Sequence, residues 1–219
     1  MEENKSIDEP YLEKSQEIFD EAYNKLEKFL YKSKTEDEII FNDLKRLHFK
    51  KAQIIIGLNL IDGRETIEEK IIPFWHLASQ GKDELKYDMY PCENHELKKF
   101  CVQKCEFDTE DNFLKDIDRI PCIYRASKIQ TFIDVIKLYN ENPNDPRIQK
   151  WTIKEKDGKH LKIRFIDKQK DIDYIIIMRI NYCKGMTDIS QYRLITAYPV
   201  IMKSYKKRFD REYRENGKK

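Results

Sequence analysis

Four residues with metal-ligating side chains stand close together near the middle of the chain. They form the pattern CxxH-x5-CxxxC and are Cys92, His95, Cys101 and Cys105. Thiolate sulfur and imidazole nitrogen suit tetrahedral zinc, and a zinc ion could cross-link a segment with little core of its own. The five residues between the half-sites are fewer than finger-like sites usually leave, so packed thiols are the favoured interpretation and zinc is the alternative. The sequence otherwise predicts no cofactor.

Motifs of the common phosphate-binding and hydrolytic enzymes are missing from the sequence. The chain has no GxxxxGK[ST], GxGxxG, GxSxG or HExxH pattern. Its four histidines lie far apart, at positions 48, 76, 95 and 160, which leaves little material for a paired-histidine centre. Acidic clusters suited to two-metal phosphodiester cleavage are sparse in the C-terminal half. Any phosphoryl chemistry there would have to proceed without metal.

A net charge of only +2 conceals two halves of opposite charge. Residues 1–118 contain 18 basic and 28 acidic side chains, whereas residues 119–219 contain 24 basic and 12 acidic ones. A basic surplus of this size fits a domain that binds a polyanion, although solvated faces of different sign would give the same count. A nucleic acid is therefore the expected partner of the C-terminal half.

Two basic residues lie three apart near the start of an expected helix in this half. Arg125 and Lys128 would share one helix face, and Arg119 precedes them in the sequence Asp118-Arg119-Ile120-Pro121. Guanidinium groups bind phosphate in a bidentate geometry, so the three residues are candidate phosphate contacts. The alternative is that they only keep the helix soluble.

The segment from Tyr192 to Val200 has the pattern of a strand. Thr196 and Tyr198 stand two apart and would share one face, where they could bind a phosphate or stack on a base. A half-buried packing role is the alternative, because Thr and Tyr favour strands in general. In an unbroken strand Tyr192 shares the face of Thr196, and Arg193 points to the opposite face.

Arg164 and His160 belong to a hairpin that precedes this strand. Arg164 stands between Ile163 and Phe165, so it faces away from the helix-packed core, toward a phosphate or toward solvent. His160 follows the turn Asp157-Gly158 and is the one natural proton shuttle at neutral pH in the basic half. A histidine at a hairpin tip is, however, more often exposed and idle.

The C-terminal helix is rich in cations. Its basic residues are Lys203, Lys206, Lys207, Arg208, Arg211 and Arg214. They could follow an RNA backbone, with affinity that falls as salt rises. The alternative is a solvated face whose charge is balanced by Asp210, Glu212 and Glu215.

Hydrophobic periodicity and turn residues predict an α+β fold. Helices are expected at residues 9–32, 36–47, 65–80 with a bend at Pro73, 128–140 and 204–216, whereas residues 52–61 are a strand or a buried helix. Strands are expected at residues 151–154, 161–166, 173–180 and 192–200, joined as an antiparallel meander. This order divides the chain into an acidic, mainly helical module at residues 1–112 and a basic α+β domain at residues 113–219.

The apolar stretches indicate no membrane segment. The longest, residues 52–61, is too short to cross a bilayer. The N-terminal sequence MEENKSIDEP has no apolar core of a signal peptide, and five cysteines is an odd number. We therefore expect reduced thiols, a cytoplasmic location and no membrane partner.

The sequence YRLITAYPV at residues 192–200 carries the one family resemblance. It resembles the final strand of the barnase–EndoU–colicin–RelE-like ribonucleases, in the branch found in bacteriophages and mobile elements, where this strand reads approximately L-x-T-A-Y-P. The preceding order of a D-R-I-P segment, Trp151, an Asp-Gly hairpin and a hydrophobic strand is similar as well. The resemblance covers about residues 113–205.

The resemblance implies RNA cleavage without metal, in which the ribose 2′-hydroxyl attacks the adjacent phosphate and leaves a 2′,3′-cyclic phosphate. EndoU-type members use two histidines and a lysine, whereas RelE-like toxins use Arg, Lys and Tyr. The C-terminal half lacks a histidine pair, which favours the second style or a relative that binds RNA without cutting it. The implied catalytic residues are Arg119, Arg125, Lys128, Arg164, Thr196 and Tyr198. The implied substrate contacts are His160, Tyr192, Arg193, Lys206, Lys207 and Arg208.

Three functional hypotheses follow. The first is a phage-type or mobile-element endoribonuclease whose acidic N-terminal module masks the basic domain, alone or with an inhibitory partner protein. The second is a nucleic-acid-binding protein that uses the same sheet without catalysis. The third is an accessory protein that binds another protein through its acidic half.

Overall fold

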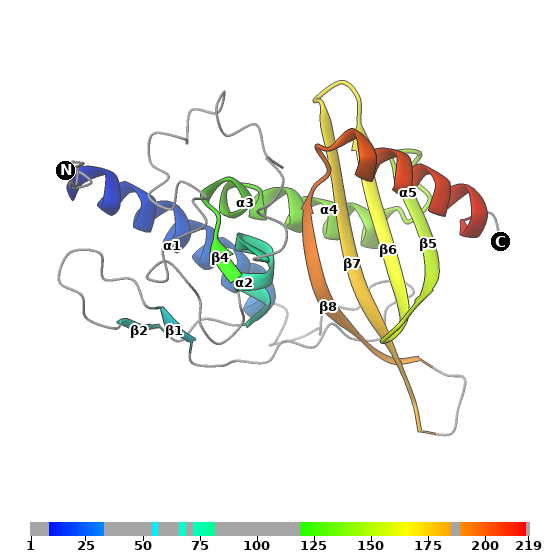
Figure 1. Ribbon diagram of the computed structural model, residues 1–219, viewed down its shortest axis with the longest axis horizontal. Coiled ribbons are helices and arrows are strands. Elements are labelled where there is room, and N and C mark those ends of the chain that lie inside the picture. The colour runs from blue at the N-terminus through cyan, green and yellow to red at the C-terminus, as the bar shows by residue number, and fades with distance from the viewer. Residues whose placement is uncertain are drawn as a thin grey trace, which may run out of the picture.

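The structure, a computed structural model, describes residues 9–32, 54–56, 66–68, 72–81, 119–184 and 189–217. Within these ranges the helices are α1 (Glu9–Lys32), α2 (Ile72–Ala78), α3 (Ile123–Ser127), α4 (Ile129–Glu141) and α5 (Lys203–Asn216). The short strands are β1 (Ile54–Ile56), β2 (Thr66–Glu68), β3 (Ser79–Gly81) and β4 (Arg119–Pro121). The long strands are β5 (Ile148–Glu155), β6 (Gly158–Asp167), β7 (Ile172–Tyr182) and β8 (Ile189–Pro199). The elements confirm the α+β class (Figure 1).

The four long strands form one antiparallel sheet in the order β5-β6-β7-β8, which confirms the predicted meander. The strands extend beyond the predicted ranges because their polar ends also pair, as Glu155 does with Gly158. Gly158 has a φ of 138°, a conformation that glycine adopts with little strain. The turn predicted at Asp157-Gly158 is therefore confirmed.

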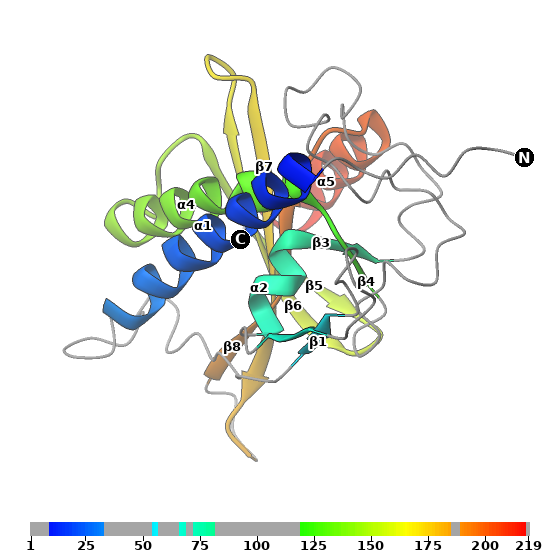
Figure 2. The same cartoon turned by 90° about the vertical axis from the view of Figure 1, so that its left-hand side faces the viewer.

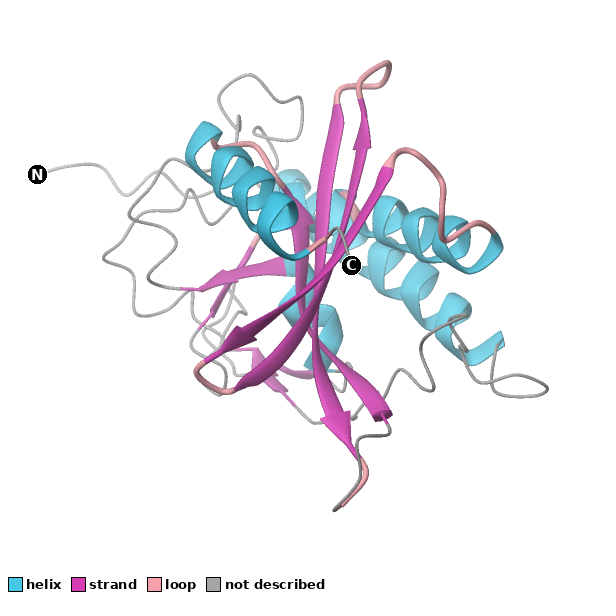
Figure 3. Ribbon diagram, turned by 90° about the vertical axis from the view of Figure 1, so that its right-hand side faces the viewer, coloured by secondary structure: helices cyan, strands magenta, loops and turns pink. Residues whose placement is uncertain are grey.

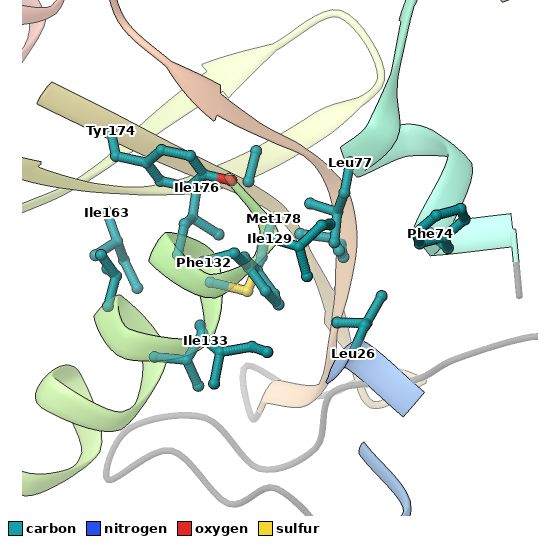
Figure 4. Close-up of a cluster of buried hydrophobic side chains, with 14 of the residues drawn as sticks. Leu26, Phe74, Leu77, Ile129, Phe132, Ile133, Ile163, Tyr174, Ile176 and Met178 are labelled. Atoms are coloured by element: carbon teal, nitrogen blue, oxygen red, sulfur yellow. The ribbon is translucent and has the colours of Figure 1, made fainter. Parts of the chain in front are cut away.

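The sheet face toward α4, which we call the inner face, is apolar. Along β6, Leu161, Ile163 and Phe165 alternate toward it and are buried in the main core. Helix α4 presents apolar residues at helical spacing to the same core. These are Ile129, Phe132, Ile133, Val135, Ile136 and Tyr139. Figure 4 shows part of this core, with side chains of α4, β6 and β7 gathered together.

Helices α1 and α2, from the N-terminal half, pack into the same core. Leu26 of α1 and Leu77 of α2 are fully buried members of it. The ring of Tyr23 meets that of Phe74 edge-on, with their centroids 5.2 Å apart. Figure 2 shows α1 and α2 beside α4 and the sheet. The described elements on both sides of residue 112 therefore share one hydrophobic core.

The opposite face of the sheet, the outer face, is covered in part by α5 (Figure 3). Phe209 of α5 is fully buried and packs with Trp151, Ile175 and Ile177 of the sheet. The ring centroids of Trp151 and Phe209 lie 6.1 Å apart. The sheet is thus a middle layer, with α1 and α4 on one side and α5 on the other.

Two predicted elements differ in the structure. The helix expected at 65–80 is wrong, because the described residues of this range belong to β2, α2 and β3, and Pro73 lies in the first turn of α2. Strand β3 pairs with β4, so that Gly81 lies opposite Arg119. The basic helix before residue 128 is the separate short helix α3. Residues 54–56 are a strand, which is one of the two alternatives for the stretch 52–61.

Other predictions lie outside the described residues. The helix expected at 36–47 and most of the stretch 52–61 belong to them. Among the described helices, none is both long enough and apolar enough to span a membrane.

Candidate nucleic-acid interface

Arg125, a predicted phosphate contact, is buried inside the fold. Its side chain is 2 % exposed. The guanidinium donates hydrogen bonds to the carbonyl oxygens of Leu77, His76 and Ala197 at 3.0, 2.8 and 3.0 Å, and to Oγ1 of Thr196 at 2.9 Å. It also lies 5.4 Å from the ring centre of Tyr198. Arg125 therefore joins α3 to α2 and β8, and its donors are occupied within the protein.

Lys128 was predicted to share a helix face with Arg125, but it does not. It lies between α3 and α4, and it is the residue at which α3 ends. Its ammonium group stands 5.2 Å from the ring centre of Tyr124. Arg119 belongs to β4, and the structure fixes only its backbone pairing with Gly81.

The predicted facing of residues along β8 is partly wrong because the strand contains a β-bulge. Ile177 of β7 pairs with Thr196 and Met178 pairs with Leu194, which leaves Ile195 as the extra residue. An extra residue shifts the alternation of side chains by one. Thr196 and Tyr198 share the outer face as predicted.

The bulge reverses the expectation for the two residues before it. Tyr192 is buried in the core of the inner face, opposite the face of Thr196. Arg193 lies across from Arg179 of β7 and shares the outer face with Thr196. Tyr198 belongs to the smaller core under α5, so it is a packing residue.

Arg164 faces away from the inner core, as its alternation predicted, but it meets neither solvent nor an open surface. It is 2 % exposed. Its Nε and Nη2 donate to the two carboxylate oxygens of Asp173 at 2.8 and 2.7 Å, and its Nη1 donates to Oδ1 of Asp210 on α5 at 2.6 Å. Burial opposes the charged form, but these carboxylates raise the pKa of Arg164. Arg164 thus fixes α5 to the sheet.

Lys162 is a buried cation that sequence reasoning missed. Its Nζ donates to Oε2 of Glu212 at 2.8 Å and to Oε1 of Glu155 at 3.2 Å. Nε1 of Trp151 donates to the same Glu212 oxygen at 3.2 Å. The alternation Leu161-Lys162-Ile163 places Lys162 on the face of Arg164. This alternation was the one sequence feature that indicated a second cation beside Arg164.

His160 is buried rather than exposed at the hairpin tip. Its residue is 8 % exposed, and its Nε2 lies 2.9 Å from Oδ1 of Asp157. Asp157 also faces Nη1 of Arg179 at 3.8 Å. Although desolvation acts in the opposite direction, His160 and Arg179 hold the pKa of Asp157 below its usual value. His160 therefore positions Asp157 at the turn.

Most cations of helix α5 lie on the side away from the sheet, whereas two of its carboxylates contact the sheet. Asp210 and Glu212, which were expected to balance the cations, reach toward the sheet and pair with Arg164 and Lys162. The cations on the far side are exposed. They are Lys203, Lys207, Arg211 and Arg214, with Arg208 at the margin and Lys206 half-buried. At a rise of 1.5 Å per residue, the stripe from Lys203 to Arg214 is about 16 Å long.

Few carboxylates approach this exposed stripe. Glu215 and the partly exposed Asp210 lie on the same side, and Arg208 contacts Glu212 at 3.4 Å. Arg214 donates from Nε to the backbone oxygen of Asp210 at 3.4 Å. The described part of the chain offers no ion-pair partner within 4.0 Å of Lys203, Lys207 or Arg211. Their charges are therefore available to a ligand.

The zinc candidates Cys92, His95, Cys101 and Cys105 lie outside the described residues. Within the described ranges, no group of three or more His, Cys, Asp or Glu side chains could hold a metal ion. Of the two cysteines described, Cys122 and Cys183, neither forms a disulfide with a described residue.

No protein family, curated protein or solved structure matches the chain.

Proposed function

We propose that the protein binds nucleic acid, with single-stranded RNA as the first candidate, through the exposed cationic stripe of α5 formed by Lys203, Lys207, Arg211 and Arg214. The arrangement of α5 carries the proposal. Glu212 is buried against Lys162, and Asp210, whose side chain is 54 % exposed, contacts Arg164 through Oδ1, so neither forms an ion pair with a described residue of the stripe. A row of basic side chains about 16 Å long matches a ligand with regularly repeated negative charge.

Cleavage of RNA stays a prediction of the resemblance alone. Arg125 and Arg164 are buried and their guanidinium donors have protein partners. Tyr198 is 7 % exposed. In this conformation these three residues stabilise contacts between elements, and binding without cleavage accounts for more of the geometry. The proposal therefore takes the second of the three hypotheses.

A charge-removal variant of α5 tests the proposal. We expect Lys203→Gln/Lys207→Gln/Arg211→Gln to weaken binding of a fluorescein-labelled single-stranded RNA by at least about tenfold at low salt, measured by fluorescence anisotropy. The slope of log K against log salt should become shallower by about 2, because each phosphate contact on a single strand contributes about 0.7. The three residues are exposed, so the variant should fold as the parent does.

The matched control removes the same charge elsewhere. Lys154→Gln/Lys168→Gln/Lys170→Gln changes three exposed lysines of the sheet strands and turns. We expect it to weaken binding less than threefold. An equal loss in both variants, or no binding by the parent protein at 50 mM salt, contradicts the proposal. The same RNA, incubated with EDTA and analysed for 2′,3′-cyclic ends, reports cleavage separately.

A further inference from the structure

The outer face of the sheet has a part that α5 does not cover. Figure 1 shows α5 crossing the strands near one end of the sheet, at the end where β8 leads into it. The contacts of α5 with β6 are to Lys162 and Arg164. Closer to the Asp157-Gly158 turn, none of the described elements lies over the outer face.

Three basic side chains form one row across this uncovered part. His160 of β6 pairs with Arg179 of β7, and Arg179 pairs with Arg193 of β8. Residues directly opposite in an antiparallel pair point to the same face. The face is the outer one, because Lys162, two residues along β6, contacts Glu212 of α5.

The two arginines of the row are an unfavourable pair by themselves. Side chains directly opposite on neighbouring strands have Cβ atoms about 4.5–5.5 Å apart, and like charges in these positions are destabilising. Among the described residues, the one carboxylate in reach is Asp157, which lies 3.8 Å from Nη1 of Arg179 and is held by His160. Arg193 is exposed and has no ion-pair partner among the described residues. An anion placed between the guanidinium groups would relieve their repulsion.

We propose that Arg179 and Arg193 together bind a phosphate of a nucleic-acid strand. The inference rests on the proposed function and adds a second contact region to the stripe of α5. Two guanidinium forks present donors in the planar geometry that fits phosphate oxygens. Asp157 and Gly158 lie beside the guanidinium of Arg179 on the turn side, and the exposed Arg193 approaches the ligand from β8.

The position of the row fits a ligand that also contacts α5. Two residues along a strand correspond to about 6.8 Å, so the arginine row lies one such step from the row of Lys162. Lys162 is the point at which Glu212 of α5 meets the sheet. The Arg179–Arg193 pair therefore borders the covered area rather than standing apart from it.

The variant Arg193→Gln tests this site. We expect the affinity for a labelled 12-nucleotide oligouridylate, measured by anisotropy at 50 mM salt, to fall about threefold to tenfold. The salt slope should decrease by about 0.7, one phosphate contact. The melting temperature should stay the same or rise, because the substitution removes a like-charge contact; a merely structural role would lower it. Arg193→Lys should keep the slope and recover part of the affinity.

The control and the α5 variant separate the two proposals. Lys170→Gln removes one exposed charge from the β6–β7 turn and should change the affinity less than twofold. If Arg193→Gln matches Lys170→Gln while the triple variant of α5 loses binding, the site is wrong and the proposed function stands. If neither variant loses affinity, both are wrong. Inorganic phosphate at constant ionic strength is the second probe, and Arg193-dependent binding of phosphate without any effect on the oligonucleotide also overturns the site.

Discussion

The two faces of the β5–β8 sheet are both packed against helices, but the side chains buried under these helices differ in chemistry. On the inner face, Ile163 and Phe165 pack against α4 in a core of aliphatic and aromatic side chains. On the outer face, the residues that alternate with them, Lys162 and Arg164, are equally buried but meet carboxylates of α5. A buried cation needs a partner, and α5 supplies that partner from its own acidic residues. The charged outer face therefore determines which charges α5 leaves for solvent, and with them the surface proposed to bind nucleic acid.

The largest effect is expected from the inner face. Phe132 of α4 is fully buried, and Phe132→Ala should reduce the free energy of unfolding by about 3–5 kcal/mol through lost burial and a residual cavity. Chemical denaturation followed by circular dichroism measures this change. Phe132→Leu is the control and should cost clearly less, because it fills most of the volume. A loss below about 1 kcal/mol for Phe132→Ala would show that the inner face is not the main source of stability.

The outer face should respond to broken charge pairing more than to lost volume. Lys162→Met leaves Glu212 without its closest cation and should cost about 3 kcal/mol, toward the lower end for a broken buried pair because Arg208 stays 3.4 Å from Glu212. The double variant Lys162→Met/Glu212→Leu removes both charges.

We expect the double variant to recover about 2 kcal/mol of this loss, since an apolar pair of similar volume can replace a buried ion pair. Trp151 loses its acceptor in the double variant, so recovery should be incomplete. A double variant less stable than the single one would show that the ion pair contributes net stability, and the outer face would then differ from the inner face less than its chemistry indicates. Thermal unfolding of the parent protein and both variants decides between these outcomes.

The elements with strong periodicity were predictable from the sequence. Helix α1 has the predicted bounds, and the sheet has the predicted order. Local pattern sufficed there because each element has one apolar face with a clear period. The helix prediction for residues 65–80 was wrong because three short elements follow one another there, and none is long enough to establish a period.

The candidate site was harder to predict because it depends on contacts between distant elements. Alternation placed Arg164 on the outer face, but nothing local indicates that Asp210, 46 residues later, covers it. The bulge at Ile195 reversed the expected facing of Arg193, and a single sequence carries no sign of a bulge at a β-branched residue. Arg125 was read as a surface cation, whereas the carbonyl groups of α2 that bind it lie nearly 50 residues earlier.

The smallest expected effect is on the free energy of unfolding at alkaline pH, which tests the inner face through Tyr174. Tyr174 is 2 % exposed in the inner core, where burial raises its pKa against a weaker opposing influence of Arg125. Above pH of about 10 the unfolded chain releases this proton while the folded protein retains it, so stability is full below pH 10 and falls by about 1.4 kcal/mol per pH unit above it. Tyr174→Phe should remove this part of the alkaline loss in denaturation curves measured between pH 9 and 11. The exposed Tyr182, replaced in Tyr182→Phe, is the control and should leave the slope unchanged. Equal slopes for Tyr174→Phe and the parent protein would mean that the inner face admits water at Tyr174, and the contrast between a dry inner face and an ion-paired outer face would no longer hold there.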